Sequence, residues 1–212
     1  EQRNRDLDLQ VQERSTSLLV ALTNALDLRD SSAQWHSRRV ALLARRVAQA
    51  VGLREAELIE IERGALLHDI GTIGVRDAIL LKKESLTEEE QVEMRAHVAH
   101  GERLLKHVDF LGRARLVVSQ HHERWDGSGY PRRMHGEEIY VGARVFAVAD
   151  AYEAVRRHRP PQEGRSHAAA VEELRKGAGR QFDPAVVEAF LSVGVDDLEA
   201  VRERARVEGT ER

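Results

Sequence analysis

The chain has 212 residues, of which 42% are hydrophobic and 33% charged, so it holds enough apolar material for a folded core. Its 33 basic and 36 acidic residues give a net charge of −3, which argues against a nucleic-acid partner because there is no basic excess. Cysteine is absent, which excludes disulfides, zinc–thiolate sites and thiol catalysis. Aromatic residues make up only 4%, and the abundance of Ala, Leu, Glu and Arg favours helices.

The hydropathy and the first residues of the chain bear on its cellular context. No apolar run approaches 18 residues, so we expect no membrane span in this chain. The chain begins at Glu1 without an apolar segment of the signal-peptide type. We therefore expect a piece of a longer intracellular protein, located in the cytoplasm.

Residues 1–28 are polar with a thin apolar stripe. The spacing of the stripe predicts one long helix with a seam, which Arg14 interrupts. Two interpretations stay open: the helix packs on its own domain, or it is a connector from a missing N-terminal sensor and forms a homodimer. We divide the chain into this N-terminal connector helix and a domain over residues 29–212. The stripe consists of Leu7, Val11, Leu18, Leu22 and Ala25.

Residues 29–212 predict an all-α bundle with one long loop. Thr87 and Glu90 form a capping box, which opens a helix that we expect to continue to about Lys106. Asp183 and Pro184 supply an N-cap and a first helical residue. The apolar run 145–149 has no visible partner strand, so a buried helix is expected there. The expected helices are 34–51, 54–70, 87–106, 111–122, 145–157, 166–176, 183–191 and 197–208.

Histidine and aspartate side chains stand inside or at the ends of five different predicted helices, where they can converge in the core of a bundle. Five neutral imidazoles and two carboxylates suit a pair of divalent metals such as Fe, Mn or Zn. A lone histidine on a helix is usually a surface residue, so the prediction depends on the whole set. Asp69 follows His68 directly and is the natural bridging carboxylate. The set is His36, His68, Asp69, His97, His121, His122 and Asp150.

Three segments of this chain resemble the HD-GYP family, the bacterial HD-superfamily phosphodiesterases of cyclic di-GMP. The resemblance extends over about residues 25–192 and implies an all-α HD-domain helical bundle with a long GYP loop. It implies a di- or trinuclear metal centre with the same seven ligands. Trinuclear members carry Glu where this chain has Ser32, which favours two ions. The segments are Gly64-Ala65-Leu66-Leu67-His68-Asp69-Ile70-Gly71, His121-His122-Glu123-Arg124-Trp125-Asp126-Gly127-Ser128-Gly129-Tyr130-Pro131 and Val148-Ala149-Asp150.

The resemblance implies hydrolysis of cyclic di-GMP to pGpG, GMP or both by a water that two divalent metals activate, with Asp69 and His68 in catalytic positions. We expect Fe or Mn, with Zn, Ni and Mg as alternatives. On the substrate side we expect the GYP loop, Gly127–Pro131, to form one wall of the site. We also expect three cations to pair with phosphates. The expected substrate-binding residues are Gly129, Tyr130, Pro131, Lys82, Arg144 and Arg159.

Several residues depart from the family pattern. Thr72 replaces the lysine that usually follows His-Asp-Ile-Gly, Glu84 replaces the glycine of Lys-Pro-Gly, and Glu153 replaces an aspartate. Pro161 and Gln162 stand where the family has Tyr and Arg. Two alternatives therefore stay open: a weakly active or inactive module that senses cyclic di-GMP or binds a partner, and an HD phosphohydrolase of another nucleotide. The resemblance also suggests a preceding sensor or receiver domain and a GGDEF-domain partner.

Overall fold

The computed structural model describes residues 14–15, 17–25, 35–157 and 164–210, and within them it is helical without a β-strand. The prediction of an all-α fold is therefore confirmed. Residues 14–15 and 17–25 form an N-terminal helical segment. The α-helices that follow are α2 (His36–Val51), α3 (Glu55–Leu67), α4 (Asp77–Leu80), α5 (Glu88–Arg95), α6 (His97–Leu105), α7 (Ala114–Gln120), α8 (Val141–Arg156), α9 (His167–Gly177), α10 (Pro184–Leu191) and α11 (Val195–Thr210). Short 3₁₀ helices are η2 (Ile70–Gly74), η3 (Asp109–Leu111) and η4 (Gly136–Glu138).

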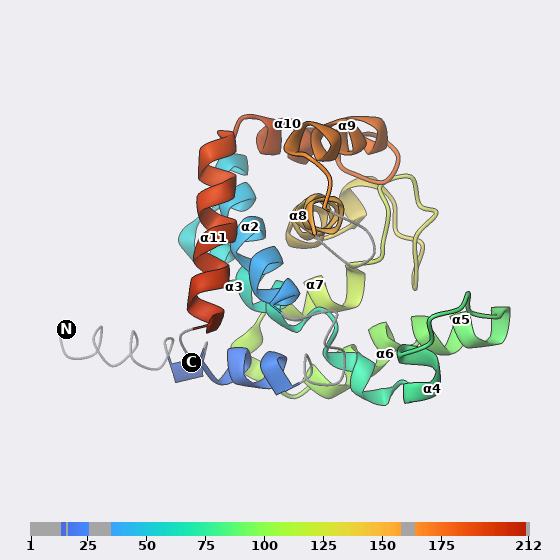
Figure 1. The fold of residues 1–212 in the computed structure, drawn as a ribbon. Coiled ribbons are helices and arrows are strands. Elements are labelled where there is room, and N and C mark those ends of the chain that lie inside the picture. The colour runs from blue at the N-terminus through green and yellow to red at the C-terminus, as the bar shows by residue number, and fades with distance from the viewer. Residues whose placement is uncertain (1–13, 16, 26–34, 158–163, 211–212) are drawn as a thin grey trace.

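Helix α8 is the centre of the bundle. In Figure 1 it is seen nearly end-on, with α9 and α10 packed across one side and α11 running beside α2. Val145, Phe146 and Val148 on α8 are at most 1% exposed, as are Leu43 on α2 and Ile61 on α3. A helix with apolar residues on all sides must be surrounded by other elements. The apolar run 145–149 is therefore a buried helix, as expected from the sequence.

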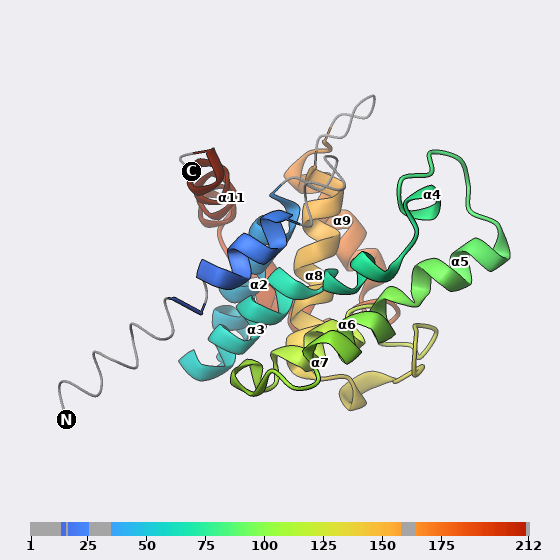
Figure 2. The ribbon, with the colours of Figure 1, turned by 90° about the horizontal axis from the view of Figure 1, so that it is seen from below.

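The expected helix 87–106 is two helices in the structure. The capping box at its start is confirmed, because the Thr87 hydroxyl accepts from the Glu90 amide and the Glu90 carboxylate accepts from the Thr87 amide. The helix ends at Arg95, however, and α6 begins at His97. The break coincides with a hydrogen bond from the His97 ring to the Met94 carbonyl, 2.7 Å long. This bond competes for a carbonyl that a continuous helix uses for its own backbone. Helices α4 and α5 extend to one side of the body (Figure 2).

The N-terminal helical segment packs on the bundle through a face that differs from the expected stripe. Leu19 is 4% exposed and lies in an apolar cluster with Leu67. The Thr23 hydroxyl is buried beside it, 3.2 Å from the Leu66 carbonyl at the end of α3. Leu18 and Leu22, two members of the stripe, are 67% and 53% exposed. The segment thus packs on its own domain, while the homodimer and the division at residue 28 stay predictions. Leu7 and Val11 lie outside the described residues.

A buried carboxylate ties the C-terminal helix to the bundle. Glu153 on α8 is fully buried, forms an ion pair with Arg39 on α2, and accepts from Arg202 on α11 at 2.8 Å. Arg202 also contacts Glu199 one turn earlier. The glutamate that replaces the family aspartate therefore has two cationic partners. None of the helices in the described ranges has the length and apolarity to cross a membrane.

Replacing Glu153 with glutamine should lower the free energy of unfolding by about 3 kcal/mol, because Arg39 and Arg202 lose the buried charge that compensates them. Urea unfolding followed by circular dichroism measures this. Glu172→Gln is the matched control, since Glu172 is exposed and pairs only with Lys176 one turn away. Equal stability of the two variants would show that the buried pair contributes nothing.

Candidate metal centre

The seven histidine and aspartate residues singled out in the sequence come together from five elements. His36 is the first residue of α2 and His97 is the first residue of α6. His68 and Asp69 follow the last residue of α3, and the pair at 121–122 follows the last residue of α7. Asp150 lies within α8. The expected convergence of five helices on one place in the core is thus present in the structure.

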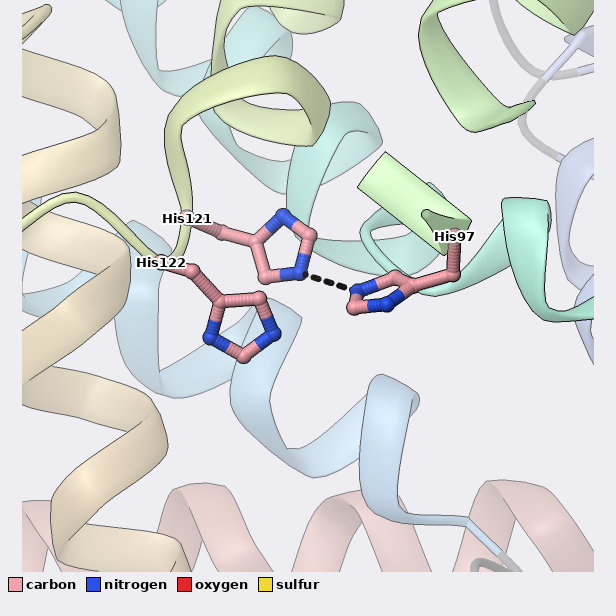
Figure 3. A group of neighbouring side chains, drawn as sticks. All are labelled: His97, His121 and His122. Carbon is pink, nitrogen blue, oxygen red and sulfur yellow. Dashed lines mark hydrogen bonds between the residues drawn. The ribbon is translucent and has the colours of Figure 1, made fainter. Parts of the chain in front are cut away.

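Three of the histidines form a compact group. The imidazoles of His97, His121 and His122 each offer a nitrogen, and these nitrogens lie within 4.8 Å of one another. Figure 3 shows the three rings turned toward a common point, with Nε2 of His97 3.1 Å from Nε2 of His121. Two nitrogens bound at about 2.1 Å to one ion, at right angles, are roughly 3.0 Å apart. The spacing therefore fits ligands of one ion.

The backbone sets which ring nitrogen of His68, His97 and His121 faces the centre. In these three residues, each at a helix end, Nδ1–H donates to the carbonyl three residues earlier. The bonds run from His68 to Ala65 (2.8 Å), from His97 to Met94 (2.7 Å) and from His121 to Val118 (2.8 Å). With Nδ1 protonated, the neutral ring presents the lone pair of Nε2, which is the ligand form.

This arrangement requires a positive charge. In their neutral forms, His97 and His121 point two Nε2 lone pairs at each other across 3.1 Å, and neither can donate. The same holds between Nε2 of His68 and the Asp69 carboxylate, 3.1 Å apart. A shared proton or a divalent cation removes the repulsion. Neutral imidazoles with carboxylates are the donor set of borderline divalent metals, so these residues fit a metal centre.

Asp69 lies between two groups of histidines. Its Oδ2 is 3.1 Å from Nε2 of His68, and its Oδ1 is 3.4 Å from Nε2 of His97 and 3.7 Å from Nε2 of His121. Beyond His68, Nε2 of His36 is 3.1 Å from Oδ1 of Asp150. Each oxygen of Asp69 thus faces a different set of nitrogen ligands.

The charges in the cluster are strongly coupled. Burial lowers the pKa of His68, but the Asp69 carboxylate outweighs it and raises that pKa to about 9. Burial raises the pKa of Asp69, but the positive charge of His68 holds it well below its usual range. Burial, together with the charge of His97, lowers the pKa of His122 to about 4. The proton on His68 occupies the position where a cation would be favoured.

The histidines form the floor of the site, and each carboxylate is enclosed by surrounding protein but keeps one edge open to solvent. His68 and His97 are each 4% exposed and His121 is 6% exposed. The side chains of Asp69 and Asp150 are 49% and 40% exposed. A ligand therefore approaches the cluster from the carboxylate side, where oxygen atoms are accessible.

The GYP loop packs directly on one histidine of the cluster. A side chain at Gly129 would lie 2.6 Å from the His122 carbonyl and 2.5 Å from the Arg124 amide, so only glycine fits there. The Tyr130 amide donates to the His122 carbonyl (3.1 Å), and the Tyr130 ring stacks on the His122 ring with centroids 4.6 Å apart. Burial raises the pKa of Tyr130 to about 12, so the hydroxyl stays protonated. The loop thus orients His122.

Glu123 is a site residue that the sequence interpretation missed. It is 4% exposed, and its carboxylate accepts from the Arg132 amide at 2.7 Å and from the Met134 amide at 3.0 Å. A buried carboxylate with two backbone donors thus holds the segment that directly follows Pro131 of the GYP loop. Its position inside the motif, directly after two ligand candidates, is the signal that was available.

The cations expected to bind substrate have other partners in the structure. Nζ of Lys82 is 2.6 Å from Oε2 of Glu90, and Nη1 of Arg144 is 2.7 Å from Oδ2 of Asp183. Arg159 lies outside the described residues. Thr72, at the position of the family lysine, donates its hydroxyl hydrogen bond to the Asp69 carbonyl at 2.8 Å. It closes the turn that presents the Asp69 carboxylate.

Comparison with known proteins identifies the class. A family model described as HD domain matches residues 21–186, and the chain belongs to this family. The chain is 40% identical over 184 residues to the cyclic di-GMP phosphodiesterase response regulator RpfG of Xanthomonas campestris pv. campestris, covering 86% of this chain and 49% of that protein. It is 38% identical to a cyclic di-GMP phosphodiesterase of Thermotoga maritima (83% and 48% covered). The resemblance drawn from the sequence is thus confirmed.

Other relatives are named for a different cyclic dinucleotide. The 3'3'-cGAMP-specific phosphodiesterase 2 of Vibrio cholerae is 35% identical, covering 89% of this chain and 36% of that protein. The chain spans about half or less of the length of these relatives. A solved cyclic GMP-AMP phosphodiesterase of V. cholerae has a TM-score of 0.64 at 20% identity, covering 87% of this chain and 52% of that one. That likeness supports the fold.

Replacing His97 with alanine should weaken metal binding by more than about 100-fold, because residues that merely orient a ligand already cost 10–100-fold. Metal per chain after dialysis, measured by inductively coupled plasma mass spectrometry, checks this. His107→Ala is the control, since His107 is exposed and lies outside the cluster. Full metal retention by the His97 variant would exclude the three-histidine group as a metal site.

Proposed function

We propose that this chain is a metal-dependent phosphodiesterase that hydrolyses cyclic di-GMP to pGpG, GMP or both. The observation that carries the proposal is Asp69, whose two oxygens face different sets of nitrogen ligands. The identity of the relatives supports the reaction class and the substrate. The open carboxylate side of the cluster gives a phosphodiester access.

The ligand geometry favours two ions for each chain. His36, His68 and Asp150 belong to one side, and the three-histidine group belongs to the other, with Asp69 shared between them. The nitrogen-rich donor set favours Fe or Mn over Mg, with Zn and Ni as alternatives. When bound, two such ions would activate a water near neutral pH and neutralise phosphate oxygens. We assign the catalytic positions beside that chemistry to Asp69 and His68.

The residues of this chain have distinct tasks in the reaction. The backbone carbonyls behind His68, His97 and His121 keep each Nε2 aimed inward, so the ligands are preorganised. Tyr130 fixes the plane of the His122 ring by stacking on it. The exposed edges of Asp69 and Asp150 mark the side from which the anionic substrate enters.

Cyclic GMP-AMP is the second candidate substrate. The relative of V. cholerae named for 3'3'-cGAMP is 35% identical, only slightly less than those named for cyclic di-GMP. The two dinucleotides share the same pair of phosphodiester groups and differ in one base. A panel of cyclic di-GMP, 3'3'-cGAMP and cyclic di-AMP, with products separated by liquid chromatography, distinguishes them. No turnover of any of the three would favour the alternative of a sensing or partner-binding module.

We place this chain in a cytoplasmic signalling protein with a sensor or receiver domain before it and a GGDEF-domain partner. The support is a relative named as a response regulator and the incomplete coverage of the relatives. The exposed Leu18 and Leu22 favour a homodimer through the N-terminal segment.

Replacing Asp69 with asparagine should reduce cyclic di-GMP turnover by several orders of magnitude, because both ions lose their shared anionic ligand. The wild type should hold two ions per chain and the variant fewer than one. Product formation and metal content are measured on the same samples, with Asp109→Asn as a control at an exposed position. Near-normal turnover by the Asp69 variant would place the reaction elsewhere.

The double substitution Leu18→Gln and Leu22→Gln should convert a dimer to a monomer, because it removes the exposed apolar face of the N-terminal segment. Light scattering across the micromolar range measures this. Leu104→Gln, at a 50% exposed position on α6, is the control. A wild type that stays monomeric throughout would rule out the homodimer.

A further inference from the structure

A cyclic dinucleotide carries two phosphodiester anions, and the metal centre accounts for only one of them. The lysine and arginine that the sequence pattern pointed to are held by acids, Lys82 by Glu90 and Arg144 by Asp183. Arg132, at the far end of the GYP loop, is also paired, with Glu102 at 2.6 Å. Within the described ranges, a contact with the second phosphate therefore calls for a cation other than these three.

Arg95 has the required placement. It is the exposed last residue of α5, two residues before His97. Its Cζ lies 5.0 Å from the centroid of the Tyr130 ring, and that ring stacks on His122. The contact series Arg95–Tyr130–His122 thus runs from a guanidinium to the metal centre. Within the described ranges, Arg95 has no ion pair with an acidic side chain.

The ring contact leaves the guanidinium able to bind an anion. The Cζ of Arg95 lies 5.0 Å from the ring centroid, and a guanidinium that stacks on a ring keeps its N–H edge available for a bidentate contact with phosphate. Stacking also restricts the side chain before binding, which lowers the entropy lost when the contact forms. Arg95 contacts the ring of Tyr130 and forms no ion pair or hydrogen bond with the seven cluster residues in the described ranges, so we assign to it the phosphate that the cluster does not hold.

We propose that Arg95 binds the second, non-reacting phosphodiester group of a cyclic dinucleotide at the lip of the metal centre. The inference rests on the proposed function, because it takes a cyclic dinucleotide as the substrate. Arg95 is a substrate-binding residue in this role and does not act on the bond that is broken. Its contact exists equally before and during the reaction, so its loss should affect KM and leave kcat largely unaffected.

Steady-state kinetics of Arg95→Gln and Arg95→Lys test the proposal. Arg95→Gln should raise KM for cyclic di-GMP about tenfold, which corresponds to one charge-assisted hydrogen bond. Arg95→Lys should give an intermediate KM, since it keeps the charge without the bidentate edge. Arg103→Gln, an exposed arginine further along α6, is the matched control and should keep the wild-type KM.

A substrate with one phosphate separates this role from a structural one. Bis(p-nitrophenyl) phosphate has a single diester group, so the ratio of kcat/KM for cyclic di-GMP to kcat/KM for this compound should fall about tenfold in Arg95→Gln. A constant ratio would overturn the proposal, because Arg95 would then only support Tyr130. Metal content of the variant is measured alongside and should match the wild type.

A failure of the proposed function can be distinguished from a failure of the Arg95 proposal. If the wild type hydrolyses none of the cyclic dinucleotides, that function is wrong, and Arg95 is judged by equilibrium dialysis of cyclic di-GMP against the metal-loaded protein. A dissociation constant about tenfold weaker in Arg95→Gln than in Arg103→Gln supports the phosphate contact. Equal constants, or no binding by the wild type, overturn it.

Discussion

The candidate metal centre depends on one repeated interaction, the hydrogen bond from a histidine Nδ1–H to the carbonyl three residues earlier. His68, His97 and His121 each make it at a helix end. The bond fixes the tautomer of these three rings and directs their Nε2 lone pairs toward the centre of the cluster. Those lone pairs repel one another until a proton or a metal cation lies between them, so the backbone geometry favours a positive charge at this place. The break between α5 and α6 at Ala96 is part of the same arrangement, because it places His97 at the start of a helix.

The composition of the site was predictable because its members occur in order on separate helices. Helix periodicity and capping signals placed His36, His68 and Asp150 in the bundle. The need for a ligand shared by two metal ions pointed to a carboxylate as the bridge. The sequence could not show which ring nitrogen faces inward, since that depends on carbonyl positions. It also could not show that Asp183 neutralises Arg144, because the pair spans 39 residues and no local pattern encodes it.

The substrate side was harder to predict for the same physical reason. A motif identifies residue types, but whether a cation is available depends on its neighbours in space. Lys82 looked like a phosphate ligand and is held by Glu90, whereas Arg95 was not among the expected substrate-binding residues and stands without an acidic partner among the described residues. Glu123 was inside the motif, yet its role required knowing that two amides of the returning loop point at it.

The ion pair between Glu153 and Arg202 has a mechanical consequence. Glu153 stands one turn after Asp150 on α8, so α11 is attached by charge to the same helix that carries a cluster carboxylate. A displacement of α11 would therefore act directly on a core helix through this ion pair. A chain cut before Val195 would leave a buried carboxylate with half of its counter-charge. The charged C-terminal helix is therefore an integral wall of the domain, joined to α8 by this ion pair and to the apolar core by the buried Leu198.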